Sequence, residues 1–295
     1  MKKFLLMAVA ALAMLATACT KDEGATEPIE EPTEQTSEIT FTVSTIEYFT
    51  RAFGDGSQAT NLHYAVYDQT TKELLFTSDA NNPTPMSGLK AEVKIPFVNG
   101  MSYDVLFWAE NAAAPYDIDW ERAMLTYDTA NTLVANQEAY DGFFCYHEVG
   151  LVSGPVSEDI KLKRPFAQLN IATADYTTAG ITIAETKVTA ESVYTSFDLR
   201  KGKVSGTTST VTFDYATKAA GSTEVDSATY ENLAVCYLLV SSTKSTIDVT
   251  MECKDASNTI TSHSYGSIPV QQNYKTNVVG NLLTSGTSST AQAAL

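Results

Sequence analysis

Hydrophobic and polar residues alternate along much of the chain with the period of two that half-buried β-strands require. The first such run begins at Ile39: Ile39, Phe41 and Val43 face one way, and the threonines between them face the other. Turn-forming clusters such as DANNPTP and VNGM separate the later runs. In the first half, strand-like runs recur at 62–68, 73–78, 90–97, 102–110 and 142–149. Short strands at this spacing predict a β-sandwich.

The second half continues the pattern beyond a proline. Ile160 and Leu162 alternate before Pro165, and Leu169 and Ile171 alternate after it. Because proline is poorly tolerated inside a central strand, Pro165 predicts a break between two strands or two domains. The later runs include GITIAETKVTA, STVTFDY, LAVCYLLV, TIDVTMEC and YKTNVVGNLL, enough for a second sandwich. One segment of the first half departs from the strand pattern: the sequence WERAMLTYD (120–128) predicts a short helix.

The N-terminus has a different character. Two lysines precede an unbroken run of apolar and small residues from Phe4 to Ala16, which predicts a secretory signal peptide over 1–18. Ala16, Thr17 and Ala18 form a lipoprotein-type cleavage site, so Cys19 is predicted to become the acylated first residue. Such acyl chains anchor a protein without a transmembrane helix. The alternative is a plain signal peptide followed by an incidental cysteine.

An acidic segment follows the cysteine, over residues 19–38. It holds seven acidic residues and one lysine, and Pro28 and Pro32 block a helix, so we expect a solvated tether. Its start, CTKDE, resembles the export signal of surface lipoproteins in the Bacteroides group. That resemblance implies a position outside the outer membrane. An ordinary charged linker in the periplasm is the alternative.

The charge of the chain limits the classes of molecule it can bind, and its length and composition indicate its architecture. The formal net charge is −16, and removing residues 1–18 with their two lysines makes it −16 − 2 = −18. Nucleic acid and anionic membrane surfaces are therefore poor partners. The length allows two ordinary domains. The many threonine, tyrosine, valine and phenylalanine residues favour an all-β architecture.

Three cysteines follow Cys19, an odd number that cannot pair completely within one chain. Cys236 and Cys253 lie on successive predicted strands. A hairpin with its turn at 241–244 would place Cys253 opposite Leu233, not Cys236. We therefore expect Cys145, Cys236 and Cys253 to be small buried hydrophobic residues.

No catalytic or cofactor site is evident in the sequence, so no enzyme activity and no cofactor are expected. His63, His147 and His263 fall on separate strands without ligands at zinc-site spacing. The chain has no GxSxG, HExxH or glycine-rich phosphate loop. The acidic stretch YDIDWER (116–122) lacks the glycine turn of a calcium loop and is expected to be a solvated loop.

Two longer motifs carry a family likeness. LKRPFAQLNI (162–171) and IPVQQNYKTNVVGNLLT (268–284), after a lipoprotein signal, resemble the fimbrillin-like proteins of Bacteroides-type bacteria, the subunits of type V pili. The resemblance implies two transthyretin-like β-sandwich domains, here 39–164 and 165–285, followed by a flexible tail at 286–295. It also implies assembly by strand exchange between subunits after proteolysis.

The resemblance places that proteolysis between Arg51 and Ala52, in the sequence YFTRAFGDG. A cut there would carry off the strand with Ile39, Phe41 and Val43 and open a groove for a donor strand. The alternative is that Arg51 is a solvated residue that ends a strand.

We therefore expect a structural or adhesive subunit of a cell-surface pilus, or fimbrium, anchored in the outer membrane through Cys19. Its expected partners are other pilus subunits, with a host protein or a glycan as a further ligand. Because the tail TSGTSSTAQAAL has no apolar stripe, either YKTNVVGNLL is the donor strand or the subunit only accepts one. The runner-up is a surface glycan-binding lipoprotein, in which exposed Trp108 and Trp120 would stack on sugars.

Overall fold

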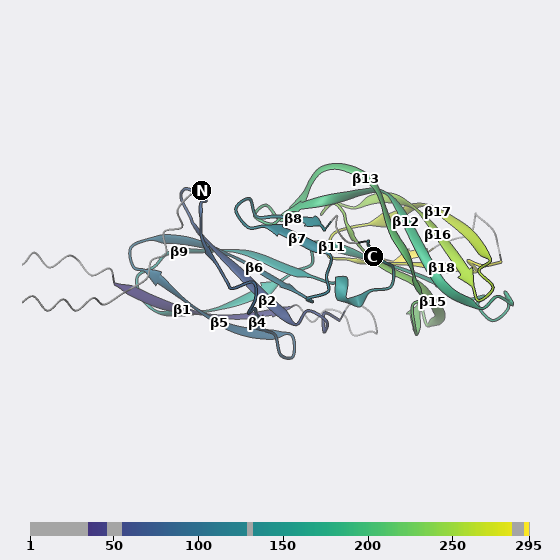
Figure 1. Ribbon diagram of the computed structural model, residues 1–295, viewed down its shortest axis with the longest axis horizontal. Helices are drawn as coiled ribbons and strands as arrows, with labels where there is room; N and C mark the ends of the chain where they lie inside the picture. The colour runs from purple at the N-terminus through teal and green to yellow at the C-terminus, as the bar shows by residue number, and fades with distance from the viewer. Residues whose placement is uncertain (1–34, 46–54, 129–131, 285–291, 295) are drawn as a thin grey trace, which may run out of the picture. The chain divides into compact units, whose positions relative to one another are not determined.

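The computed structural model describes residues 35–45, 55–128, 132–284 and 292–294 (Figure 1). Within these ranges the chain forms nineteen β-strands and one short 3-10 helix, η1 (Glu138–Tyr140). The predicted all-β class is therefore confirmed. None of the helical structure in this part of the chain is long and apolar enough to span a membrane.

Two sheets face each other around the first hydrophobic core. One sheet has the strand order β10-β1-β5, with β1 (Thr36–Thr45), β5 (Lys90–Val98) and β10 (Val156–Leu162). The other consists of β2 (Asn61–Asp68), β3 (Leu74–Thr77), β4 (Thr84–Pro85), β6 (Ser102–Glu110) and β9 (Phe143–Leu151). Inward-facing side chains of both sheets, Phe41, Phe97 and Phe107 among them, form this core.

Strand β6 is buried along both faces, which explains why SYDVLFWAE does not alternate. Val105 and Phe107 enter the first core. Leu106 and Trp108, which point the other way, belong to a second core. The two cores therefore lie on opposite faces of one strand.

The remaining strands surround the second core. They are β7 (Tyr116–Asp119), β8 (Met124–Tyr127), β11 (Phe166–Thr173), β12 (Ile183–Asp198), β13 (Lys203–Thr217), β14 (Ser222–Val225), β15 (Ala228–Leu239), β16 (Ser245–Asp255), β17 (Ile260–Val270), β18 (Lys275–Gly280) and β19 (Gln292–Ala294). One layer is built on β11, β15 and β18, and another on β12, β13, β16 and β17. A single bridge between Tyr194 and Leu239 joins β12 to β15. The break predicted at Pro165 separates β10 from β11.

The helix predicted at 120–128 is wrong, because β7 and β8 form an antiparallel hairpin there. Asp119 fixes the turn: one carboxylate oxygen accepts a hydrogen bond from the backbone N–H of Arg122 (3.0 Å), and the other from its Nε (2.6 Å). Ala123 has a φ of 52°, outside the helical region. The side-chain hydrogen bonds of an aspartate thus override the helical propensity of the stretch.

The expected hairpin between the strands of Cys236 and Cys253 is also wrong. In the sheet order, β12 lies between β15 and β16. Cys236 lies opposite Leu169 of β11, whereas Cys253 lies opposite Thr186 of β12. The three described cysteines are free, and Cys236 and Cys253 are buried as expected, whereas Cys145 is partly exposed.

The strand predicted at YKTNVVGNLL (274–283) is β18, and it pairs within the second half of the chain, as expected of a strand in the second sandwich. Here β18 runs parallel to β11 and antiparallel to β19. Three residues of the expected tail, Gln292–Ala294, thus form a strand, which differs from the expectation of a flexible segment at 286–295. The predicted signal peptide at 1–18 and the predicted tether as far as residue 34 lie outside the described residues. The last three residues of the predicted tether, 36–38, belong to β1 instead.

Candidate functional site: the channel filled by strand β1

Strand β1 is the middle strand of its three-stranded sheet. It pairs in parallel with β10, from Ile39–Val156 to Thr45–Leu162, and antiparallel with β5, from Thr36–Val98 to Ser44–Lys90. Within the described residues, β5 and β10 are joined in this sheet only through β1. Without β1, two rows of unpaired backbone groups would face each other across an open channel.

The predicted inward face of β1 is confirmed. Ile39 is 1% exposed, and Phe41 and Val43 are fully buried, whereas Thr42 is exposed. The Phe41 ring meets Phe97 and Phe107 edge-on, at centroid distances of 6.4 and 5.3 Å. Each inward side chain of β1 thus fills a pocket made by the rest of the first core.

A polar contact lies beside the central pocket. His147 of β9 contacts the carboxylate of Glu158 on β10 through its Nε2 atom. The same imidazole lies edge-on to Phe41, with 6.2 Å between the ring centroids. Because β9 and β10 belong to opposite sheets, this pair closes the side of the sandwich next to β1.

Three predicted site residues, Cys19, Arg51 and Ala52, lie outside the described residues. The described chain stops at Thr45 and resumes at Asp55. Gly56 then has a φ of 77°, and a Cβ atom at this position would lie 2.9 Å from the Phe143 ring. A glycine is therefore required where the chain re-enters the first core.

The aromatic platform expected of a glycan-binding protein is not present at the predicted positions. Trp108 is fully buried in the second core. Trp120 is half-buried against that core, and its carbonyl accepts a hydrogen bond from the Tyr67 hydroxyl at 2.7 Å. The two tryptophans therefore do not form an exposed stacking surface.

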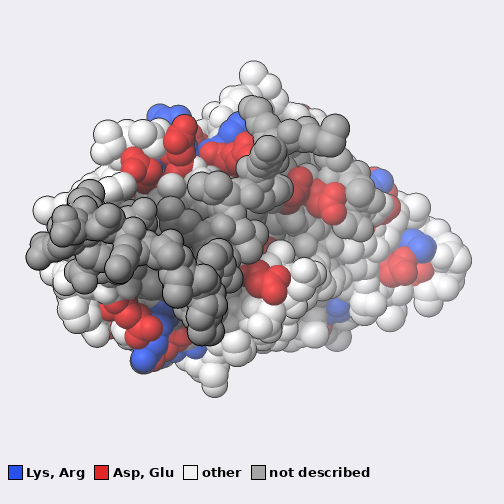
Figure 2. Space-filling view, turned by 60° about the vertical axis from the view of Figure 1, so that its left-hand side comes forward, with Lys and Arg blue, Asp and Glu red and all other residues white. Residues whose placement is uncertain are grey.

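The charged side chains that the structure describes do not gather into a metal site. On the face in Figure 2, acidic side chains lie in several separate groups, some with a basic neighbour. Among the described residues, no group of three or more histidine, cysteine, aspartate or glutamate side chains could hold a metal ion. Of the acidic stretch at 116–122, Asp119 pairs with Arg122 in the β7–β8 turn.

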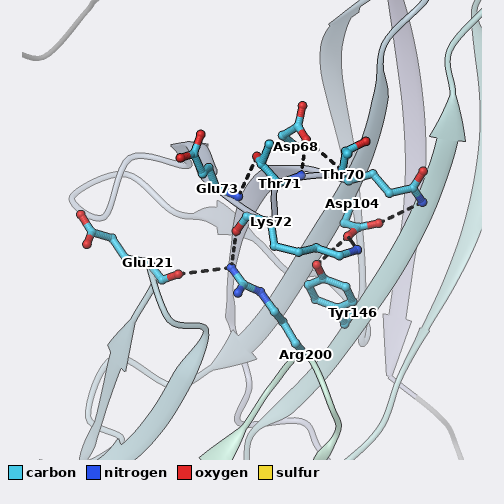
Figure 3. A network of polar contacts seen from close by, with 10 residues as sticks. Asp68, Thr70, Thr71, Lys72, Glu73, Asp104, Glu121, Tyr146 and Arg200 are labelled. Carbon is cyan, nitrogen blue, oxygen red and sulfur yellow. Dashed lines mark hydrogen bonds and ion pairs between the residues drawn. The ribbon is translucent and has the colours of Figure 1, made fainter.

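A buried carboxylate inside the apolar run of β6 escaped the sequence analysis. Asp104 is fully buried and accepts hydrogen bonds from Lys72 Nζ (2.6 Å), the Tyr146 hydroxyl (2.6 Å) and Gln69 Nε2 (3.2 Å) (Figure 3). Burial, together with the bond to Asp104, raises the pKa of Tyr146. The signal available in the sequence was an aspartate within an otherwise apolar run.

Arg200, in the turn between β12 and β13, reaches the same region. Its Nη2 donates hydrogen bonds to the carbonyl oxygens of Lys72 (2.8 Å) and Glu121 (3.2 Å) (Figure 3). Its guanidinium also lies 4.6 Å from the centroid of the Tyr67 ring. Burial raises the pKa of Tyr67 to about 12, although Arg200 opposes that shift. Arg200 thus ties the β12–β13 turn to the loop after β2.

The two motifs that carry the family resemblance meet at Arg164. Its guanidinium is bound to Asp141, and its backbone N–H donates to Asn273 Oδ1 at 3.1 Å. The backbone N–H of Asn273 in turn donates to the carbonyl of Phe166 at 2.8 Å. The motifs therefore form one structural unit, in which β11 and β18 run side by side.

The chain belongs to a family of unknown function (DUF6562), whose profile matches residues 29–292. No curated protein matches it. Among solved structures, a candidate adhesin from Bacteroides ovatus is similar at a TM-score of 0.51 and 13% identity, over 88% of this chain and 93% of that one. A candidate adhesin from Bacteroides thetaiotaomicron is similar at a TM-score of 0.51 and 11% identity, over 84% of this chain and 92% of that one. These likenesses show the fold.

A further similar structure is the tip fimbrial protein Mfa3 from Porphyromonas gingivalis. It matches at a TM-score of 0.42 and 9% identity, over 82% of this chain and 94% of that one.

Proposed function

We propose that the chain is the lipoprotein precursor of a pilus subunit at the outer cell surface, and not an enzyme. In this account, proteolysis after Arg51 releases β1, and a strand from a neighbouring subunit takes its place. The observation that carries the proposal is the position of β1, an N-terminal strand that lies in the middle of a sheet. A cut after Arg51 separates this strand from all that follows it in the chain.

After β1 leaves, a channel filled by a donated strand has a lower free energy than an empty channel. Burying each of Ile39, Phe41 and Val43 stabilises the fold by about 1.5–3 kcal/mol. The backbone groups of β5 and β10 would also lose their partners. A donated strand with large apolar residues at every second position would restore both contributions, which is β-augmentation.

In this account the uncut precursor is protected from premature assembly and is held at the membrane. While β1 is in place the channel is full, so subunits cannot polymerise during export. Lipid on Cys19 would hold the precursor at the outer membrane, and the cut would remove lipid, tether and β1 together. Neighbouring subunits are the proposed partners, and the buried Trp108 argues against the glycan-binding alternative.

The cut is tested by treating the folded precursor with limiting amounts of an arginine-specific protease and sequencing the new N-terminus. The proposal predicts Ala52 as the first new N-terminal residue and no such product from an Arg51→Ala variant. The matched comparison is Arg122, which is 77% exposed in the β7–β8 turn. Cutting after Arg122 while Arg51 resists would overturn the maturation step.

The anchor is tested in intact cells. Labelled palmitate should enter the wild-type chain but not a Cys19→Ala variant, and external protease should degrade the wild-type protein. Protection of the protein until the cells are lysed would overturn the surface location.

A further inference from the structure

An apolar tip lies at one end of the first sandwich, next to the start of β1. Three of the most exposed large hydrophobic side chains in the described residues are located there: Leu151 is 67%, Val156 48% and Met101 45% exposed. The backbone N–H of Val152 donates to the carbonyl of Met101 at 2.9 Å, and Val156 pairs with Ile39 of β1. The turn between β5 and β6 and the loop between β9 and β10 thus form one surface.

The two loops of this tip are uncharged, in a chain whose net charge is −16. An exposed ion pair borders them: Glu38 of β1, opposite Pro96, lies 3.7 Å from Lys94 of β5. Neither 95–103 nor 149–157 contains an aspartate, glutamate, lysine or arginine. Exposed proline and glycine residues, such as Pro96 and Pro155, complete its surface. An exposed apolar surface of this kind marks a contact with a protein or a membrane.

The point where the chain enters the structure decides between these two partners. The carbonyl of Gln35, the first described residue, accepts a hydrogen bond from the backbone N–H of Asn99 at 2.8 Å, inside the tip. Sixteen residues, 19–34, connect Gln35 to the predicted lipid on Cys19. Even a fully extended chain of this length spans at most about 58 Å. The anchor therefore keeps the tip at a local concentration in the millimolar range near the bilayer.

We propose that this tip rests on the lipid bilayer in the anchored precursor. Leu151, Met101 and Val156 would enter the boundary between headgroups and acyl chains, as the apolar face of an interfacial segment does. Because the two loops carry no basic residue and Lys94 beside them is paired with Glu38, a zwitterionic surface suits the tip better than an anionic one. The inference rests on the lipoprotein part of the proposed function and does not depend on strand exchange.

Contact with lipid can be measured through tryptophan fluorescence. The lipidated Leu151→Trp variant is reconstituted into phosphatidylcholine vesicles with or without brominated acyl chains, which quench tryptophans that touch them. The matched control is Ile260→Trp, because Ile260, the first residue of β17, is 53% exposed. The native tryptophans contribute the same background to both variants. We expect the added fluorescence of Leu151→Trp to be mostly lost in brominated vesicles and that of Ile260→Trp to persist.

A second variant links the quenching to the apolar surface. Adding Met101→Glu and Val156→Glu to Leu151→Trp should restore most of the lost fluorescence, because carboxylates resist entry into the bilayer. Equal fluorescence of Leu151→Trp in brominated and ordinary vesicles, with lipid on Cys19 verified by mass, overturns this inference alone. If the tryptophan at position 151 is protected from solvent only when the protein self-associates, and brominated lipid does not quench it, the tip contacts protein. That result also overturns the inference. A mass without lipid overturns both this inference and the lipoprotein part of the proposed function.

Discussion

Arg164 grips Asp141 with two parallel hydrogen bonds, from Nε to Oδ1 at 2.6 Å and from Nη2 to Oδ2 at 2.7 Å. Arg164 is 5% exposed and Asp141 1%. The planar fork of arginine matches a carboxylate in this geometry, and lysine does not reproduce it. The pair lies where β10 ends and β11 begins, so it fixes the path of the chain between the two cores.

Loss of this arginine should strongly destabilise the fold. We expect Arg164→Met to lower the free energy of unfolding by about 3–5 kcal/mol, because it leaves the buried Asp141 carboxylate without its cation. Urea denaturation measures the change. Arg122→Met removes the exposed pair with Asp119 and should cost no more than about 1 kcal/mol. Equal effects of the two substitutions would contradict a structural role for the buried pair.

The Asp104 network makes a second stability prediction. Tyr146→Phe removes one hydrogen bond to a fully buried carboxylate and should cost about 1.5–3 kcal/mol in urea denaturation. Tyr274→Phe is the matched control, since the Tyr274 side chain is 45% exposed and its change should stay within about 0.5 kcal/mol. If Tyr146→Phe leaves the free energy of unfolding unchanged, the hydrogen bonds from Lys72 and Gln69 alone satisfy the Asp104 carboxylate.

Stability at acid pH should depend on Asp175. Burial alone would raise its pKa, but hydrogen bonds from Thr173, Leu283 and Thr284 hold the pKa below the ordinary value of 3.8. A carboxylate with a lowered pKa stabilises the fold above 3.8 and loses that contribution as pH falls through its folded-state pKa. The melting temperature of the wild type should therefore fall as pH drops below about 4.

The substitution Asp175→Asn isolates this effect. It should lower the melting temperature at neutral pH and flatten the decline below pH 4, because the amide does not titrate. Asp226→Asn, at an exposed turn, should leave both unchanged. An Asp175→Asn protein with the wild-type pH profile would contradict the assignment.

Local patterns predicted much of the fold, because a period of two is visible within a few residues. The inward positions Ile39, Phe41 and Val43 follow from alternation alone. The partners of β1 do not: Thr45 pairs with Leu162, and no local signal specifies a parallel contact at that separation. The central position of β1, on which the functional account depends, therefore needed the structure.

Side-chain chemistry explains the other differences. The stretch 120–128 has good helix formers, but hydrogen bonds from Arg122 to Asp119 select a turn. The Asp104 network joins β6 to Lys72 and Tyr146, which lie 32 and 42 residues away in the chain. Such contacts form only after the strands have paired, so residue spacing does not reveal them.

Entry of a free strand into the cut precursor tests the central claim most directly. The precursor is cut after Arg51, and a fluorescent peptide of residues 36–45 is added while its anisotropy is followed. We predict that the cut protein binds the peptide and the uncut protein does not. A Phe41→Ala peptide should bind more weakly by a factor of about 10² to 10³ or more, since losing that side chain from its pocket costs about 3–5 kcal/mol. A Thr42→Ala peptide should bind as the original does. Equal binding of the peptide to the cut and uncut proteins would contradict the exchange of β1. Equal affinity of the Phe41→Ala and original peptides would contradict it as well.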